Sequence, residues 1–191
     1  MSLAPLHMAG ERLMLCPSGV ALWPARRTLI VADLHFEKGS HFAARGQLLP
    51  PYDTRATLER LGRTLRRHDP QRIILLGDSF HDGEGASRLH RDDAAALHRL
   101  LHGRETVWVL GNHDPAPPDG WPGSAVPMLQ EGKLAFRHIG GGPIARHGEA
   151  EVSGHLHAFW PLFPRGGRAF LLGQDRLHSL PVMPQRGVQP A

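Results

Sequence analysis

The 191-residue sequence has one cysteine, Cys16, so no disulfide can form within the chain. It also lacks any run of 18 apolar residues, and a transmembrane helix is therefore not expected. The first residues, Met1–His7, do not show the basic and then apolar pattern of an export signal. These three absences together predict a protein of the reducing cytoplasm that has no association with membranes.

Aromatic residues make up only 6% of the chain, and they form no series that could stack successive bases of a single strand. The net charge of +4 permits an anionic partner without requiring one. The arginines expected on the outer face of a helix at Asp53–His68 alternate with acidic residues, which is typical of a solvated helix face. Histidine, in contrast, is abundant with 14 residues, and it is the side chain of metal ligation and of proton transfer near neutral pH.

Short apolar runs alternate with amphipathic stretches, as expected of a layered α/β protein. The apolar runs predict strands at Thr28–Ala32, Arg72–Leu76 and Thr106–Leu110, and the helical spacing of leucines predicts helices at Asp53–His68 and Asp92–His102.

The second part of the chain has a different pattern. Proline and glycine predict a loop over Pro115–Pro127. Shorter strands are expected at Lys133–Arg137, around Val152, at Ala169–Leu172 and at Leu180–Met183. We expect one domain over residues 1–184 and a frayed tail at 185–191.

Each of the three main strands runs into a polar cluster. The carboxyl ends of neighbouring strands meet at one edge of an α/β sheet, so these clusters are expected to lie close together. The clusters are Asp33-Leu34-His35, Gly77-Asp78 and Gly111-Asn112-His113-Asp114. Two further groups follow along the chain, the single His138 and then Gly154-His155-Leu156-His157.

This mixture of carboxylate and imidazole suits manganese, iron or zinc better than calcium or magnesium. Asp33 and His35 are two residues apart, so in an extended strand end they would point the same way. The two oxygens of Asp78 could bridge a pair of cations about 3.5–4 Å apart, the spacing of two-metal hydrolytic sites. Glycines beside these residues would let the backbone turn sharply.

The five clusters, taken in order from about residue 28 to 157, resemble those of the calcineurin-like metallophosphoesterases. The resemblance implies an α/β (α+β) fold with four αββα layers and with two metals at the strand ends. It also implies that the first metal is held by Asp33, His35, Asp78 and His157. The second metal would be held by Asp78, Asn112, His138 and His155, with His147 as an alternative to His138.

The same resemblance implies that His113 acts on the phosphate and that Asp114 orients the ring of His113. Two cations would lower the pKa of a bridging water, and the resulting hydroxide would attack phosphorus. Lys38 and Arg45, in the loop beside the first ligands, are candidates for binding substrate phosphate. His81 is a third candidate at the site, with an ordinary surface position as its alternative.

A closer resemblance is to the bacterial ligase-associated DNA-damage-response phosphoesterases or endonucleases. It rests on Val31–Gly39, Arg45-Gly46, Leu48–Thr54, Gly77–Asp82 and Phe136–His138. It implies a manganese-dependent phosphodiesterase that cuts single-stranded DNA in repair, with a DNA ligase and an Lhr-like helicase as partners. The alternatives are a phosphatase or pyrophosphatase of a small nucleotide-like compound, and a metal-stabilised interaction module.

The sequence departs from this subfamily at three places. No proline follows His157, the C-terminal region is short, and Gly140–Gly142 lengthens the loop after His138. None of these departures removes a predicted ligand, so we expect them to affect the substrate range rather than the chemistry.

Overall fold

The computed structural model describes residues 3–47, 53–116, 120–141, 148–155 and 168–170. The strand expected at Leu180–Met183, the tail at 185–191, and both His147 and His157 lie outside these ranges. Within them, no helix is both long enough and apolar enough to cross a membrane.

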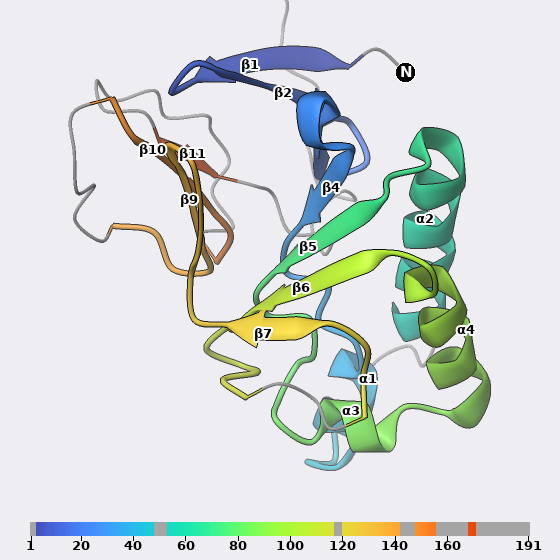
Figure 1. Ribbon diagram of the computed structural model, residues 1–191. Coiled ribbons are helices and arrows are strands. Elements are labelled where there is room, and N and C mark those ends of the chain that lie inside the picture. The colour runs from blue at the N-terminus through green and yellow to red at the C-terminus, as the bar shows by residue number, and fades with distance from the viewer. Residues whose placement is uncertain (1–2, 48–52, 117–119, 142–147, 156–167, 171–191) are drawn as a thin grey trace, which may run out of the picture.

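A seven-stranded sheet forms the centre of the fold (Figure 1). Its strands follow chain order, and they are β1 (Ala4–Met8), β2 (Glu11–Cys16), β3 (Val20–Trp23), β4 (Thr28–Val31), β5 (Arg72–Leu76), β6 (Glu105–Val109) and β7 (Ser124–Val126). The pairs from β1 to β4 are antiparallel, and the pairs from β4 to β7 are parallel. The strands predicted at 28–32, 72–76 and 106–110 are confirmed as the parallel β4, β5 and β6, so their carboxyl ends meet at one edge.

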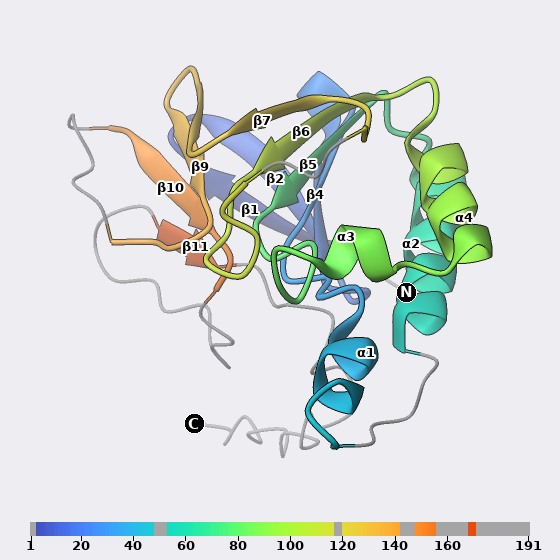
Figure 2. The same ribbon diagram turned by 90° about the horizontal axis from the view of Figure 1, so that it is seen from below.

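Helices cover one face of this sheet. The helical elements are η1 (Pro24–Arg26), α1 (Lys38–Ala43), α2 (Asp53–His68), α3 (Gly85–Arg88) and α4 (Arg91–Leu101). α2 and α4 pack on the sheet through leucines such as Leu61 and Leu97, which meet Leu29 and Ile73 in a buried cluster. The two predicted long helices are confirmed, whereas the short α1 and α3 are additional and lie at the carboxyl end of β4 and β5 (Figure 2).

A four-stranded sheet covers the opposite face. It contains β8 (Leu129–Glu131), β9 (Leu134–Arg137), β10 (Ala150–Ser153) and β11 (Arg168–Phe170), in the order β11-β10-β9-β8. Ile30 and Ile74 of the large sheet and Phe136 and Val152 of the small one share a second buried cluster. The chain thus has the mixed α/β architecture that the resemblance implied. Three of the four expected αββα layers are found in the described residues: the helices, the large sheet and the small sheet. No described helix covers the outer face of the small sheet.

β7 corrects the prediction of an uninterrupted loop over Pro115–Pro127. This strand pairs with β6 in parallel, with Val107 opposite Ser124. Gly123 makes the pairing possible, because its φ is +114° and a Cβ there would lie 2.3 Å from the Thr106 carbonyl oxygen. Pairing with a distant strand therefore outweighs the loop-forming composition of this segment.

Candidate metal centre

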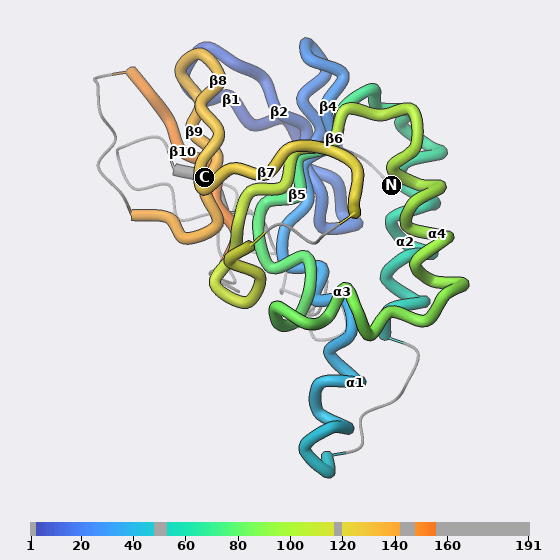
Figure 3. The backbone as a smooth tube through the Cα atoms, turned by 60° about the horizontal axis from the view of Figure 1, so that its bottom comes forward, coloured from blue at the N-terminus to red at the C-terminus, as the bar shows by residue number. Residues whose placement is uncertain are grey.

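The loops after β4 and β5 continue the pairing of the strands before them. The N–H of Asp33 donates to the carbonyl of Gly77, and the N–H of His35 donates to that of Asp78, at 3.1 and 2.9 Å. The N–H of His113, in the loop after β6, donates to Asp78 Oδ1 at 2.9 Å. Figure 3 shows the three loops side by side at this end of the sheet. The structure therefore brings together the clusters that the sequence singled out.

Four of the predicted ligands have left-handed backbones. The φ angles of Asp33, His35, Asp78 and His155 lie between +45° and +60°. Residues that carry a Cβ rarely adopt this conformation, and such strain is concentrated at functional sites. The expectation of an extended strand end at Asp33 and His35 is therefore wrong, although both side chains still reach Asp78.

Two groups of donor atoms form around Asp78. Asp33, His35 and Asp78 make one group, and Asp78, His138 and His155 make the other. In each group the ligand atoms lie within 4.8 Å of one another, which is close enough to hold one metal ion. Asp78 belongs to both groups, as a carboxylate that bridges two cations would.

Asn112 joins the second group through His138. The Oδ1 atom of Asn112 lies 2.9 Å from His138 Nε2, and that nitrogen is 3.2 Å from Asp78 Oδ2. The ring of His155 is also close, with its Nδ1 atom 3.2 Å from the same nitrogen. Of the remaining predicted ligands, His157 and the alternative His147 lie outside the described residues.

The electrostatics of the cluster fit a cation. Burial would raise the pKa of Asp78, but the hydrogen bonds from His138 and from the His113 backbone outweigh it and lower the pKa to about 2. Burial would lower the pKa of His138, yet Asp78 and Asp33 raise it. The ionised carboxylate of Asp78 attracts positive charge, and the surrounding imidazoles supply the nitrogen donors that transition metals prefer.

Glycines let the chain approach this cluster closely. A Cβ on Gly77 would lie 2.3 Å from His138 Cγ, and one on Gly111 would lie 2.2 Å from Asp78 Oδ1. Only Gly77 of these two needs a left-handed backbone, with a φ of +78°. The sharp turn expected from the sequence therefore explains Gly77, whereas lack of space explains Gly111.

Asp114 and His113 differ from expectation in their partners. The Asp114 carboxylate accepts hydrogen bonds from the backbone N–H groups of Gly111, Asp78, Ser79 and Phe80, at 2.7–3.2 Å. The ring of His113 instead lies against the carbonyl of His81, with its Nδ1 atom 2.7 Å from that oxygen. Because a carbonyl only accepts, Nδ1 carries a proton and Nε2 remains for the substrate. Burial, and after it the charge of Asp78, raises the pKa of Asp114 to about 6, although the hydrogen bonds from backbone N–H groups act to lower it.

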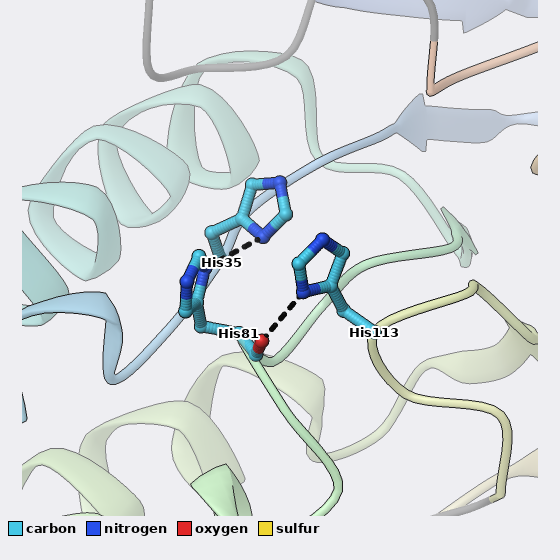
Figure 4. A group of neighbouring side chains, drawn as sticks. All are labelled: His35, His81 and His113. Carbon is cyan, nitrogen blue, oxygen red and sulfur yellow. Dashed lines mark hydrogen bonds between the residues drawn. The ribbon is translucent and has the colours of Figure 1, made fainter. Parts of the chain in front are cut away.

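His81, His35 and His113 form a third donor group, which consists of histidines alone (Figure 4). Its Nδ1 atom lies 3.3 Å from His35 Nδ1, and its side chain is buried, so the surface alternative is wrong. Burial, and after it the neighbouring His113 and His41, together lower the pKa of His81 to about 4. His81 is thus held neutral beside the predicted ligands.

His41 is a further histidine beside this group, and no sequence motif singles it out. Its Nδ1 atom is hydrogen-bonded to Asp82, and its ring centroid lies 4.7 Å from that of His81. Asp82 also accepts a hydrogen bond from Arg88 at 2.7 Å. Only this contact between α1 and the loop after β5 reveals the position of His41, and no local motif encodes it.

The predicted substrate residues lie beside this histidine group. Lys38 begins α1 and is close enough to His81 to lower its pKa. Arg45 lines a cavity of about 320 Å³ together with His41, Asp82 and Arg88. A larger cavity of about 530 Å³ lies between α2 and α4, but charges of both signs line it, and Arg55 pairs there with Asp93 at 3.2 Å.

Comparison with known proteins places the chain in a family. The family model described as calcineurin-like phosphoesterase matches residues 26–175, so the chain belongs to that family and is a metal-dependent phosphoesterase. Among solved structures it is similar to the Pseudomonas putida nuclease MPE, with 30% identity and a TM-score of 0.62. This similarity covers 82% of the present chain and 74% of the nuclease. No curated protein matches the sequence.

Proposed function

We propose that this phosphoesterase hydrolyses phosphodiester bonds of DNA as a manganese-dependent endonuclease. The observation that carries the proposal is the pair of donor groups that share Asp78. The similarity to a nuclease favours a nucleic-acid substrate over a small phosphate compound. A role in repair beside a DNA ligase and an Lhr-like helicase is part of the same proposal, and it rests on the subfamily motifs.

In this proposal Asp33, His35 and Asp78, with His157, hold the first metal. Asp78, Asn112, His138 and His155 hold the second. Carboxylate, amide and imidazole donors together suit manganese, with iron and zinc as alternatives. When bound, two such cations supply Lewis-acid stabilisation of the phosphoryl oxygens and activate water for attack in line.

The side chains around the metals handle the substrate and its protons. In this role His113 carries a proton on each ring nitrogen. It donates the Nε2 proton to the departing oxygen and becomes neutral, while its Nδ1–H stays fixed on the His81 carbonyl. Asp114 positions the two loops that carry Asp78 and His113. Lys38 and Arg45 attract the negative backbone of the substrate, as basic side chains do for phosphates in general.

The test is cleavage of circular single-stranded DNA with Mn²⁺, because a circle has no ends and only an endonuclease can cut it. We expect the wild type to linearise the circle, Asp78→Ala to lose this activity, and the exposed-carboxylate control Asp92→Ala to keep it. Hydrolysis confined to small monoesters would contradict the proposal and indicate a small-molecule phosphatase. Metal binding with no hydrolysis of any ester would indicate an interaction module.

A further inference from the structure

An apolar rim borders the second donor group. A cavity of about 270 Å³ has Asn112 and His138 in its lining, and Met128 and Ile139 line the same cavity. In the described part of the chain these two are the large apolar side chains left exposed, at 40% and 53%. Catalysis at a metal gives no reason for exposed apolar side chains there, so the rim requires a different explanation.

The rim is fixed relative to the predicted ligands. Met128 directly precedes β8, and Ile139 directly follows His138 at the end of β9. β8 and β9 pair antiparallel with Leu129 opposite Phe136, and one further step of this register sets Met128 opposite Arg137. The N–H of Leu110 donates to the carbonyl of Val126 at 3.0 Å, which joins the rim to the loop that carries Asn112.

We propose that this cavity binds the nucleoside on one side of the scissile phosphodiester, an inference that rests on the proposed function. Asn112 and His138 would face the phosphate. The side chains of Met128 and Ile139 would pack on the base, since bases stack on apolar as well as aromatic side chains. The cavity is slightly smaller than the pockets that bind drug-sized ligands, so its volume suits one nucleoside rather than several nucleotides.

The charges in the cavity favour a neutral base over a second phosphate. Arg137 is the cationic side chain of the lining, and its Nε atom lies 3.2 Å from Oε2 of Glu151. Glu151 is 1% exposed, so its negative charge offsets that of Arg137 within the protein. The apolar surface, rather than net charge, would then recognise the ligand.

The test compares three diesters that release the same p-nitrophenolate with Mn²⁺ present. They are methyl p-nitrophenyl phosphate, thymidine 5′-(p-nitrophenyl phosphate) and thymidine 3′-(p-nitrophenyl phosphate). We expect the wild type to prefer at least one thymidine ester over the methyl ester about tenfold in kcat/KM, as a single stacked base would give. The preferred isomer identifies the side of the phosphate on which the nucleoside sits.

The double variant Met128→Ser/Ile139→Ser should lose most of this preference and keep the methyl-ester rate within about twofold, since both side chains are exposed. Gln130→Ser, an exposed site on the same hairpin and outside the cavity, should keep the preference. A wild type without preference, or a double variant that retains it or loses methyl-ester activity equally, would overturn the inference alone. A wild type inactive on all three diesters would overturn the proposed function and the inference with it.

Discussion

At the scale of single residues, Asp114 shows how a short motif can conceal a structural role. Its carboxylate accepts four backbone hydrogen bonds, from the loop after β5 and from its own loop after β6. Asp78 and His113 depend on these loops for their positions. Asp114 therefore acts on the site through the backbone rather than through an imidazole ring.

Replacing Asp114 with alanine removes the acceptor of three buried N–H groups and of the part-buried N–H of Gly111. We expect Asp114→Ala to lower the free energy of unfolding by about 3–5 kcal/mol, given the cost of unsatisfied buried donors. Asp114→Asn keeps one oxygen and should lose less. Urea denaturation would measure both, with the exposed Asp92→Ala as a control that should change stability by less than about 0.5 kcal/mol. A stability of Asp114→Ala equal to that of wild type would contradict this role.

His113 is expected to act as the proton donor to the leaving oxygen. His113→Ala should keep the metal content of the wild type but lose turnover by roughly 10²–10⁴-fold, the usual contribution of a general acid. The loss should be larger for an oligonucleotide than for a p-nitrophenyl ester, because nitrophenolate leaves without protonation. Metal analysis and kinetics on both substrates provide the test, and equal losses on the two would exclude the proton-donor role.

The sequence predicts the candidate metal ligands because they lie in short motifs, most of them at the end of an apolar strand. It does not predict the left-handed backbones of Asp33 and His35, which depend on pairing between two distant loops. It also does not predict the partner of His41, since the contact with Asp82 spans 41 residues. Local signals identify the chemistry, whereas tertiary contacts decide the geometry.

At the scale of elements, Asp82 ties the loop after β5 to α1 and α3. Its carboxylate is bonded to His41 of α1 and to Arg88 of α3. Burial would raise the pKa of Asp82, but the hydrogen bonds from Arg88 and His41 outweigh it and hold the pKa well below the ordinary value of 3.8. The folded state therefore stabilises the ionised carboxylate of Asp82 relative to the unfolded state.

This depressed pKa gives a stabilisation that is present above about pH 3.8 and is lost as the pH falls through the lower folded-state value. We expect Asp82→Asn to lower the free energy of unfolding at pH 6–7 by about 1–3 kcal/mol, the value of hydrogen bonds to a charged group. The deficit should shrink below pH 4. Urea denaturation of both proteins across this range gives the measurement, and a deficit that grows on acidification would contradict the assignment.

The elements that the sequence misses are those held by pairing rather than by propensity. β7 is three residues long, and its segment is fixed by β6 and by a 2.9 Å hydrogen bond from Trp108 Nε1 to the Pro122 carbonyl. β1, β2 and β3 were likewise not predicted, and their antiparallel pairing extends the large sheet. β4, β5, β6 and the long helices were predictable because their apolar segments are continuous or recur with a helical period.

At the scale of the whole molecule, two sheets and two buried clusters bring distant segments to one site. β4, β5 and β6 of the large sheet deliver Asp33, Asp78 and Asn112. His138 follows β9 and His155 follows β10, both of the small sheet. The second donor group therefore exists only when the two sheets are packed, which couples metal binding to folding.

The most direct test of the account compares hydrolysis of bis-p-nitrophenyl phosphate and p-nitrophenyl phosphate with Mn²⁺, in wild type and in Asp78→Ala. A two-metal phosphodiesterase should show a higher kcat/KM for the diester, dependence on added metal, and loss of both activity and bound metal in Asp78→Ala. Preference for the monoester, or a variant that matches the wild type in metal content and rate, would contradict it.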